Sequence, residues 1–167
     1  MDNQTQTALA EGTFVAYTAG SCKGNPGPGG CAFRLYFPDG QPIEKARHSL
    51  DTSNNIAAMW AVIDALEATP GDASVLVCLN CDYIKSNYEQ RLVGWVDKGW
   101  LKSDGKPVAN RELWQRIVAL SATRKVAFEK VTTDPSNPNI AHVLNLARDA
   151  THRAARRANL EFGGAER

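Results

Sequence analysis

The stretch YTAGSCKGNPGPGG, residues 17–30, constrains the fold of this chain more than any other segment. Its first residues are typical of a strand end, and the glycines and prolines that follow restrict the backbone to a tight turn. A turn this constrained usually positions functional side chains. Ala19, however, has a side chain that can neither bind a metal ion nor transfer a proton. The segment therefore predicts a strand that runs into a rigid turn. The function of that turn has to be inferred from other segments of the chain.

The hydrophobic pattern predicts an α/β fold with helices on the faces of a mixed sheet. Residues 12–20 and 30–50 indicate three antiparallel strands, with a hairpin at Pro38-Asp39-Gly40. A helix is expected within 52–72, and the apolar run 74–80 is typical of a strand covered on both faces. A further helix is expected to about Val93, followed by a polar, tryptophan-bearing loop over 94–110. The last expected elements are a helix over 111–123, a strand over 125–131 and a long helix over 138–162. One domain over 13–162 is expected, between a flexible segment at 1–12 and a tail at 163–167.

Composition narrows the functional classes. No apolar run approaches the roughly 20 residues that span a bilayer, and the polar amino terminus does not resemble a signal peptide, so a cytoplasmic protein without membrane contact is expected. The pair Cys78 and Cys81 could be half of a zinc site, but no second pair completes it, which favours reduced thiols and no cofactor. The net charge is +1, so nucleic-acid binding has to come from a local patch.

Three segments together resemble the type 1 ribonuclease H family, ribonuclease HI, over roughly residues 13–160. The turn at 17–30 is similar to the family's strand-turn signature Y-T-D-G-S-x-x-x-N-P-G-x-G-G. The segment TSNNIAAMWAVIDALEA is similar to its T-x-N-x-x-E-L-x-A helix start, and residues 94–117 are similar to its basic protrusion and the helix after it. The resemblance implies a ribonuclease H-like fold, a five-stranded mixed sheet with its first three strands antiparallel and helices on both faces.

The resemblance also implies a site that this chain lacks. The family cleaves the RNA strand of RNA–DNA hybrids with two magnesium ions held by four carboxylates. Carried over position by position, those carboxylates fall on Ala19, Ala58, Asn80 and Leu144. We therefore expect no catalytic residues, no bound metal and vestigial ligand positions.

Two nearby carboxylates could partly replace the missing ligands. Asp82 follows the strand that ends near Asn80, and Asp134 falls where the family has the histidine of a flap before its last helix.

Residues that the family uses to contact nucleic acid are retained. The resemblance implies contacts in the minor groove from Cys22, Asn25, Ser53, Asn54 and Asn55, and contacts to the DNA strand from Trp95, Lys98 and Trp100. The same amides and hydroxyls could instead close turns and cap a helix.

Three functional hypotheses follow. The first is a catalytically inactive ribonuclease H-like protein, a pseudoenzyme that binds an RNA–DNA hybrid or structured RNA without cleaving it. The second is a protein-interaction or assembly module on the same scaffold, with a protein partner. The third is a weak, residual, metal-dependent ribonuclease H.

Overall fold

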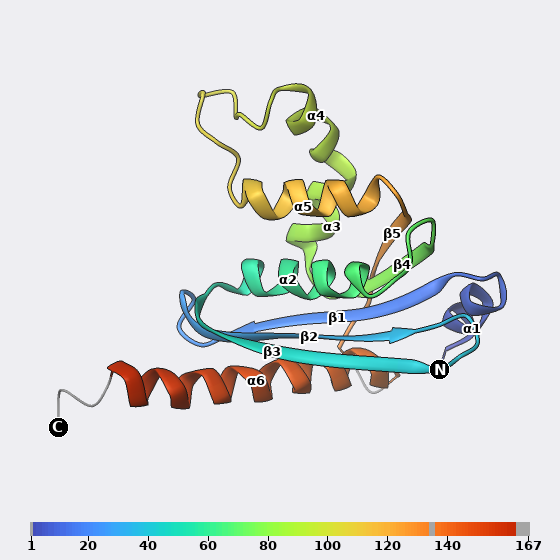
Figure 1. Ribbon diagram of the computed structural model, residues 1–167, viewed down its shortest axis with the longest axis horizontal. Helices are drawn as coiled ribbons and strands as arrows, with labels where there is room; N and C mark the ends of the chain where they lie inside the picture. The colour runs from blue at the N-terminus through green and yellow to red at the C-terminus, as the bar shows by residue number, and fades with distance from the viewer. Residues whose placement is uncertain (1, 134–135, 163–167) are drawn as a thin grey trace.

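A five-stranded mixed sheet forms the centre of the protein, with strand order β3-β2-β1-β4-β5 and helices on both faces (Figure 1). The structure, a computed structural model, describes residues 2–133 and 136–162. The strands are β1 (Phe14–Cys22), β2 (Gly27–Tyr36), β3 (Pro42–Thr52), β4 (Ser74–Leu79) and β5 (Lys125–Lys130). The helices are α1 (Asn3–Ala10), α2 (Asn54–Glu67), α3 (Asp82–Gln90), α4 (Leu92–Asp97), α5 (Arg111–Ser121) and α6 (Pro138–Phe162). This architecture confirms the predicted fold class.

The pairing of β1 leaves part of its edge open. β1 is antiparallel to β2 over Val15–Cys22, whereas its parallel pairing with β4 covers only Phe14–Tyr17. The last residues of β1 therefore have a strand neighbour on one side only. In open α/β sheets, ligand sites form where parallel strands end at their carboxyl ends. The open edge beyond Tyr17 is such a place.

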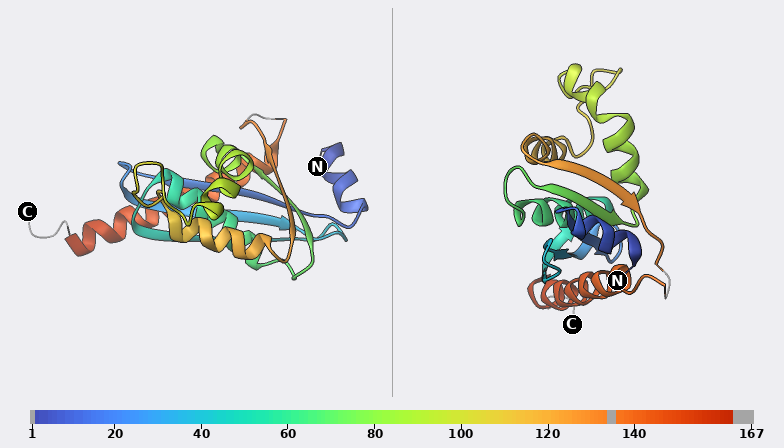
Figure 2. Two further views of the ribbon diagram at one scale, coloured as in Figure 1. Left: turned by 90° about the horizontal axis from the view of Figure 1, so that it is seen from above. Right: turned by 90° about the vertical axis from the view of Figure 1, so that its right-hand side faces the viewer.

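Two hydrophobic cores lie on opposite faces of the sheet, each between the sheet and the helices that cover that face. On one face α2 packs on the sheet, and α5 lies beyond it with Trp114 and Ile117 fully buried. On the other face α6 packs along β1, β2 and β3, with Val143 and Ile140 in the core. The views in Figure 2 show α6 on one side of the sheet and α3, α4 and α5 on the other. No helix within the described parts of the chain is long and apolar enough to cross a membrane.

The amino-terminal segment differs from its sequence prediction. Residues 1–12 were expected to be flexible, but Asn3–Ala10 forms α1, which is capped by the Asp2 side chain. Leu9 is buried, and the Thr5 hydroxyl lies 2.7 Å from the hydroxyl of Tyr17 in β1. An isolated helix of this length is marginal in water, so contacts with the sheet stabilise it.

The segment after α3 is also more helical than expected. The sequence predicted a non-helical excursion from residue 94, whereas α4 continues through Gly94 to Asp97. The loop that follows is closed by a bridge between Leu101 and Pro107. Together α4 and this loop, residues 92–110, form a protrusion that stands away from the sheet beyond α2 (Figure 1).

Gly20 allows β1 and α2 to approach closely. A Cβ atom at Gly20 would lie 2.3 Å from the backbone nitrogen of Ala58 and 2.6 Å from the carbonyl carbon of Ala57. We expect Gly20→Ala to lower the free energy of unfolding by about 1–3 kcal/mol, because backbone atoms must move to accept the methyl group. Urea denaturation measures this change. Gly71→Ala is the matched control, since nothing lies within 4 Å of its added Cβ, and an equal loss in both variants would contradict the prediction.

Candidate nucleic-acid interface

A pocket of about 310 Å³ lies at the open edge of β1. It is bounded by the ends of β1 and β4, the start of α2 and the first half of α6. Its lining residues are Thr18, Ala19, Gly20, Asn54, Asn55, Ala58, Leu79, Asn80, Cys81, Thr133, Ile140 and Leu144. The structure therefore brings together Ala19, Ala58, Asn80 and Leu144, the four positions that sequence analysis singled out. We call this cavity the strand-end pocket.

The strand-end pocket does not fit a two-magnesium centre. None of its described lining residues carries a carboxylate. Within residues 2–133 and 136–162, no group of three or more His, Cys, Asp or Glu side chains is placed to hold a metal ion. Magnesium requires oxygen ligands in near-octahedral geometry and is usually held through carboxylates. Asn80 offers one neutral oxygen, and its Nδ2 donates to the Thr133 hydroxyl at 3.2 Å. The described lining of the strand-end pocket therefore lacks the ligands that a pair of magnesium ions requires.

The two carboxylates proposed as replacements do not supply a described ligand. Asp82 begins α3, is 72% exposed, and forms an ion pair with Lys130 at 2.8 Å. It is absent from the lining of the strand-end pocket. Asp134 lies outside the described residues. The suggestion that Asp82 assists a metal site therefore has no geometric support.

The cysteines are free thiols, as the sequence predicted. Burial raises the pKa of Cys78 to about 12 and that of Cys31 to about 11. Burial also raises the pKa of Cys81, which lines the strand-end pocket. These three thiols are therefore protonated near neutral pH, and Cys81 adds no negative charge to the pocket.

The residues near the start of α2 that were predicted to contact the minor groove of a nucleic acid differ in their contacts within the protein. The Ser53 side chain caps α2 by accepting from the backbone nitrogen of Ile56 at 3.1 Å. The side-chain Oδ1 of Asn25 accepts a hydrogen bond from the backbone nitrogen of Asn54 at 2.8 Å, which ties the glycine-rich turn to the same helix start. The Cys22 thiol contacts the Thr52 carbonyl oxygen at 3.3 Å. Ser53 therefore holds the start of α2, and Cys22 and Asn25 hold the turn against it. Asn54 and Asn55 are exposed and line the strand-end pocket.

Asn25 is therefore expected to act through the turn. Asn25→Ala removes the acceptor for the backbone nitrogen of Asn54, so the free energy of unfolding should fall by about 0.5–2 kcal/mol, as for other lost helix caps. Thermal or urea denaturation measures this loss. Asn159→Ala, on an exposed part of α6, should change stability little. Unchanged stability of Asn25→Ala would show that the turn holds without this bond.

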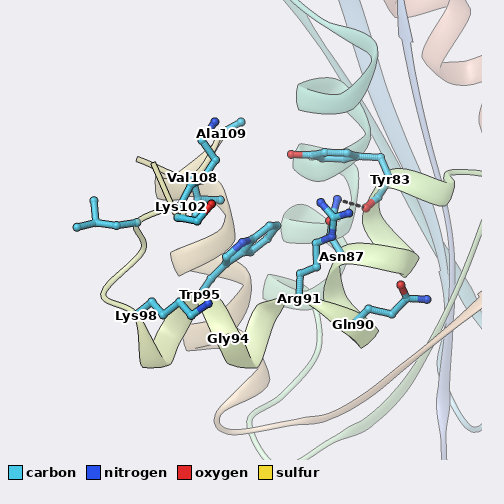
Figure 3. Close-up of a pocket in the computed structure, with 12 residues that line it drawn as sticks. Tyr83, Asn87, Gln90, Arg91, Gly94, Trp95, Lys98, Lys102, Val108 and Ala109 are labelled. Atoms are coloured by element: carbon cyan, nitrogen blue, oxygen red, sulfur yellow. Dashed lines mark hydrogen bonds between the residues drawn. The ribbon is translucent and has the colours of Figure 1, made fainter. Parts of the chain in front are cut away.

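A second cavity, of about 540 Å³, lies between α3 and the protrusion (Figure 3). The Trp95 ring stands among the side chains of Asn87, Arg91 and Lys102, and Lys98 lies on the same side as the loop. The cavity is lined by Tyr83, Asn87, Gln90, Arg91, Gly94, Trp95, Lys98, Leu101, Lys102, Ser103, Val108 and Ala109. Basic and aromatic groups in one concave surface are suited to nucleic-acid phosphates and bases. We call it the protrusion cavity.

Of the predicted protrusion residues, Trp95 and Lys98 line this cavity and Trp100 does not. Trp100 instead packs against Trp95, with ring centroids 6.4 Å apart. The structure adds Tyr83, Asn87 and Arg91, which sequence analysis missed. They recur at intervals of four residues, a spacing that places side chains on one face of a helix and could have revealed them.

Comparisons with known proteins place the chain in a family. The family model for RNase H matches residues 11–151. The chain belongs to the RNase H family. Ribonuclease H of Paracoccus denitrificans is 36% identical over 139 residues, which cover 81% of this chain and 90% of the relative. Ribonuclease H of Dinoroseobacter shibae is 37% identical over 140 residues, covering 81% and 89%.

Solved structures of RNase H proteins share this fold. LC9-RNase H1, a type 1 RNase H with the type 2 active-site motif, aligns over 85% of this chain and 73% of its own, with a TM-score of 0.73 and 22% identity. LC11-RNase H1 in complex with RNA/DNA hybrid aligns over 86% of this chain and 99% of its own, with a TM-score of 0.64 and 25% identity.

These relatives correct the leading sequence-based hypothesis. The prediction of a catalytically inactive protein that is not an enzyme is contradicted by the RNase H relatives, which are named Ribonuclease H and match over most of this chain. That the four pocket positions correspond to the family's metal ligands stays a prediction.

Proposed function

We propose that this protein binds RNA–DNA hybrids and is a weak ribonuclease H that hydrolyses their RNA strand. The observation that carries the proposal is the strand-end pocket, which opens between β1 and β4 in a chain matched to RNase H over residues 11–151. We expect the nucleotides that flank the bound phosphate to contact the protrusion cavity, whose lining holds Trp95, Lys98 and Lys102. A relative of this fold was solved with RNA/DNA hybrid bound, which supports the choice of ligand.

The chemistry that the described residues support is positioning and hydrogen bonding. Asn54, Asn55 and Asn80 present amide groups at the pocket. Amide N–H donors can bind phosphate oxygens and stabilise charge that develops on them during hydrolysis, and one well-placed donor is worth about 10²–10³ in rate. Without carboxylate-bound metal ions the rate should stay far below that of a two-metal nuclease. Weak turnover is therefore the expected activity.

A cleavage assay with matched variants tests this function. A labelled RNA–DNA hybrid is incubated with purified protein in Mg²⁺, in Mn²⁺ and in EDTA, beside single-stranded RNA and double-stranded DNA. Slow cleavage confined to the RNA strand of the hybrid is expected. It should fall by about 10²-fold or more in Asn55→Leu and Asn80→Leu, on the scale of one lost donor, and stay unchanged in Asn159→Leu. Turnover that is equal in all variants, or that does not follow the protein through purification, would reject the enzyme.

Binding is tested separately by competition between nucleic acids. The hybrid should compete better than double-stranded DNA at the same salt concentration, because an RNA-containing duplex presents 2′-hydroxyls in a wide minor groove. Equal, weak binding to every nucleic acid would contradict the proposal and favour a protein-interaction scaffold.

The protrusion cavity should contribute affinity without selectivity. Lys98→Ala is expected to weaken binding of hybrid and double-stranded DNA alike and to reduce the slope of log K against log salt by about one unit, because one phosphate contact is lost. Titrations at several salt concentrations measure both effects. Lys125→Ala is the control, since Lys125 is exposed at the start of β5 and lines neither cavity. Equal slopes for the two variants would exclude Lys98 from the interface.

A further inference from the structure

The described lining of the strand-end pocket is uncharged. Ala19, Ala58 and Leu144 contribute hydrocarbon. The polar side chains are the neutral amides, hydroxyls and thiol of Asn54, Asn55, Asn80, Thr18, Thr133 and Cys81. Ala58 belongs to α2, is buried and lines the pocket. The pocket thus differs in charge from one that holds a pair of magnesium ions.

Two described carboxylates on α3 and β5 have partners outside the pocket. Asp82, next to the lining residue Cys81, is paired with Lys130. Glu129, at the end of β5, accepts a hydrogen bond from Gln4 of α1. These two described carboxylates therefore already have partners outside the pocket.

The charge of the pocket lining determines whether a phosphate can bind without cations. A phosphodiester carries one negative charge, and clustered carboxylates repel it unless cations neutralise them. In a neutral pocket this repulsion is absent. Amide and hydroxyl donors can then bind the phosphate oxygens directly, and in a partly enclosed site such bonds are strengthened.

We propose that the strand-end pocket binds a phosphodiester of the RNA strand directly, through Asn54, Asn55 and Asn80, and that hybrid binding needs no divalent cation. This rests on the proposed recognition of hybrids. It adds to that function the ligand group held in the pocket and the independence of binding from magnesium.

Fluorescence anisotropy of a labelled hybrid tests the inference, in EDTA and in excess Mg²⁺ at equal ionic strength. The Kd of the natural protein should agree within about threefold between the two conditions, a difference below about 1 kcal/mol by the relation of Kd to free energy. Ala19→Asp combined with Asn80→Asp places two charges in the pocket. We expect its affinity in EDTA to fall by about tenfold or more, and Mg²⁺ to restore it.

A matched variant separates the pocket from net charge. Gln41→Glu with Asn159→Asp adds the same two charges at exposed positions outside the pocket. It should bind with little dependence on Mg²⁺. If it behaves like the pocket variant, local charge in the pocket is not the cause, and the inference is rejected.

The remaining outcomes distinguish this inference from the proposed function. Binding of the natural protein that appears only with Mg²⁺ would overturn the inference and leave hybrid recognition intact. Absence of hybrid binding in both conditions would overturn both.

Discussion

Placing carboxylates at all four pocket positions should raise the rate of hybrid cleavage in Mg²⁺ by about 10³-fold. The variant carries Ala19→Asp, Ala58→Glu, Asn80→Asp and Leu144→Asp. These four residues line one cavity, so their carboxylates would surround a common volume. Metal ions stabilise transition-state charge by several kcal/mol, and about 4 kcal/mol corresponds to about 10³ in rate.

The same variant should lose stability when divalent cations are absent. Four like charges in one pocket repel each other, so the free energy of unfolding should fall in EDTA and recover in Mg²⁺. Binding to the folded state alone adds about 2.7 kcal/mol at a ligand concentration of about 100 times Kd. Urea denaturation in both conditions measures this, and single-turnover cleavage measures the rate. A variant that folds, binds Mg²⁺ and binds hybrid, yet cleaves no faster than the natural protein, would contradict the assigned positions.

Trp114→Ala should lower the free energy of unfolding more than Asn25→Ala or Gly20→Ala does. Trp114 in α5 is fully buried, and its ring lies 5.9 Å from that of Tyr83 and 5.7 Å from that of Trp95. Its Nε1 donates to the Tyr83 hydroxyl at 3.3 Å. Removing a buried tryptophan leaves a cavity and typically lowers the free energy of unfolding by about 3–5 kcal/mol.

The effect should also reach the protrusion cavity. Tyr83 and Trp95 line that cavity, so loss of the ring behind them should loosen the surface and weaken hybrid binding even under conditions where the variant is folded. Trp114→Phe should retain most of the stability and affinity. Leu160→Ala is a surface control, because Leu160 is 84% exposed. Full hybrid affinity in a folded Trp114→Ala variant would show that the protrusion does not depend on this packing.

Most of the architecture could be predicted from local sequence. The apolar run 74–80 has the length and composition of a buried strand, and the structure places β4 there, between β1 and β5. Helical spacing over 138–162 matches α6. Such patterns determine elements because an apolar face must be buried whatever the rest of the chain does. The resemblance to ribonuclease HI placed Ala19 at the end of the first strand and Asn80 at the end of the fourth. In the structure Ala19 lies within β1, beyond its pairing with β4, and Asn80 directly follows β4.

Only the tertiary structure decided which side chains are available to a ligand. Asn25 lies in a turn, and only the structure shows that its Oδ1 holds the start of α2 through the backbone nitrogen of Asn54. Its contact with nucleic acid stays a prediction. Local pattern also failed for α1, whose stability comes from contacts such as that between Thr5 and Tyr17, twelve residues apart. The protrusion cavity likewise joins Tyr83 to Lys102 from separate elements. In each case the role of a side chain or a short helix depends on a contact with a residue distant in the chain. Local sequence periodicity cannot predict such contacts, because it reports only which residues share a face of one element.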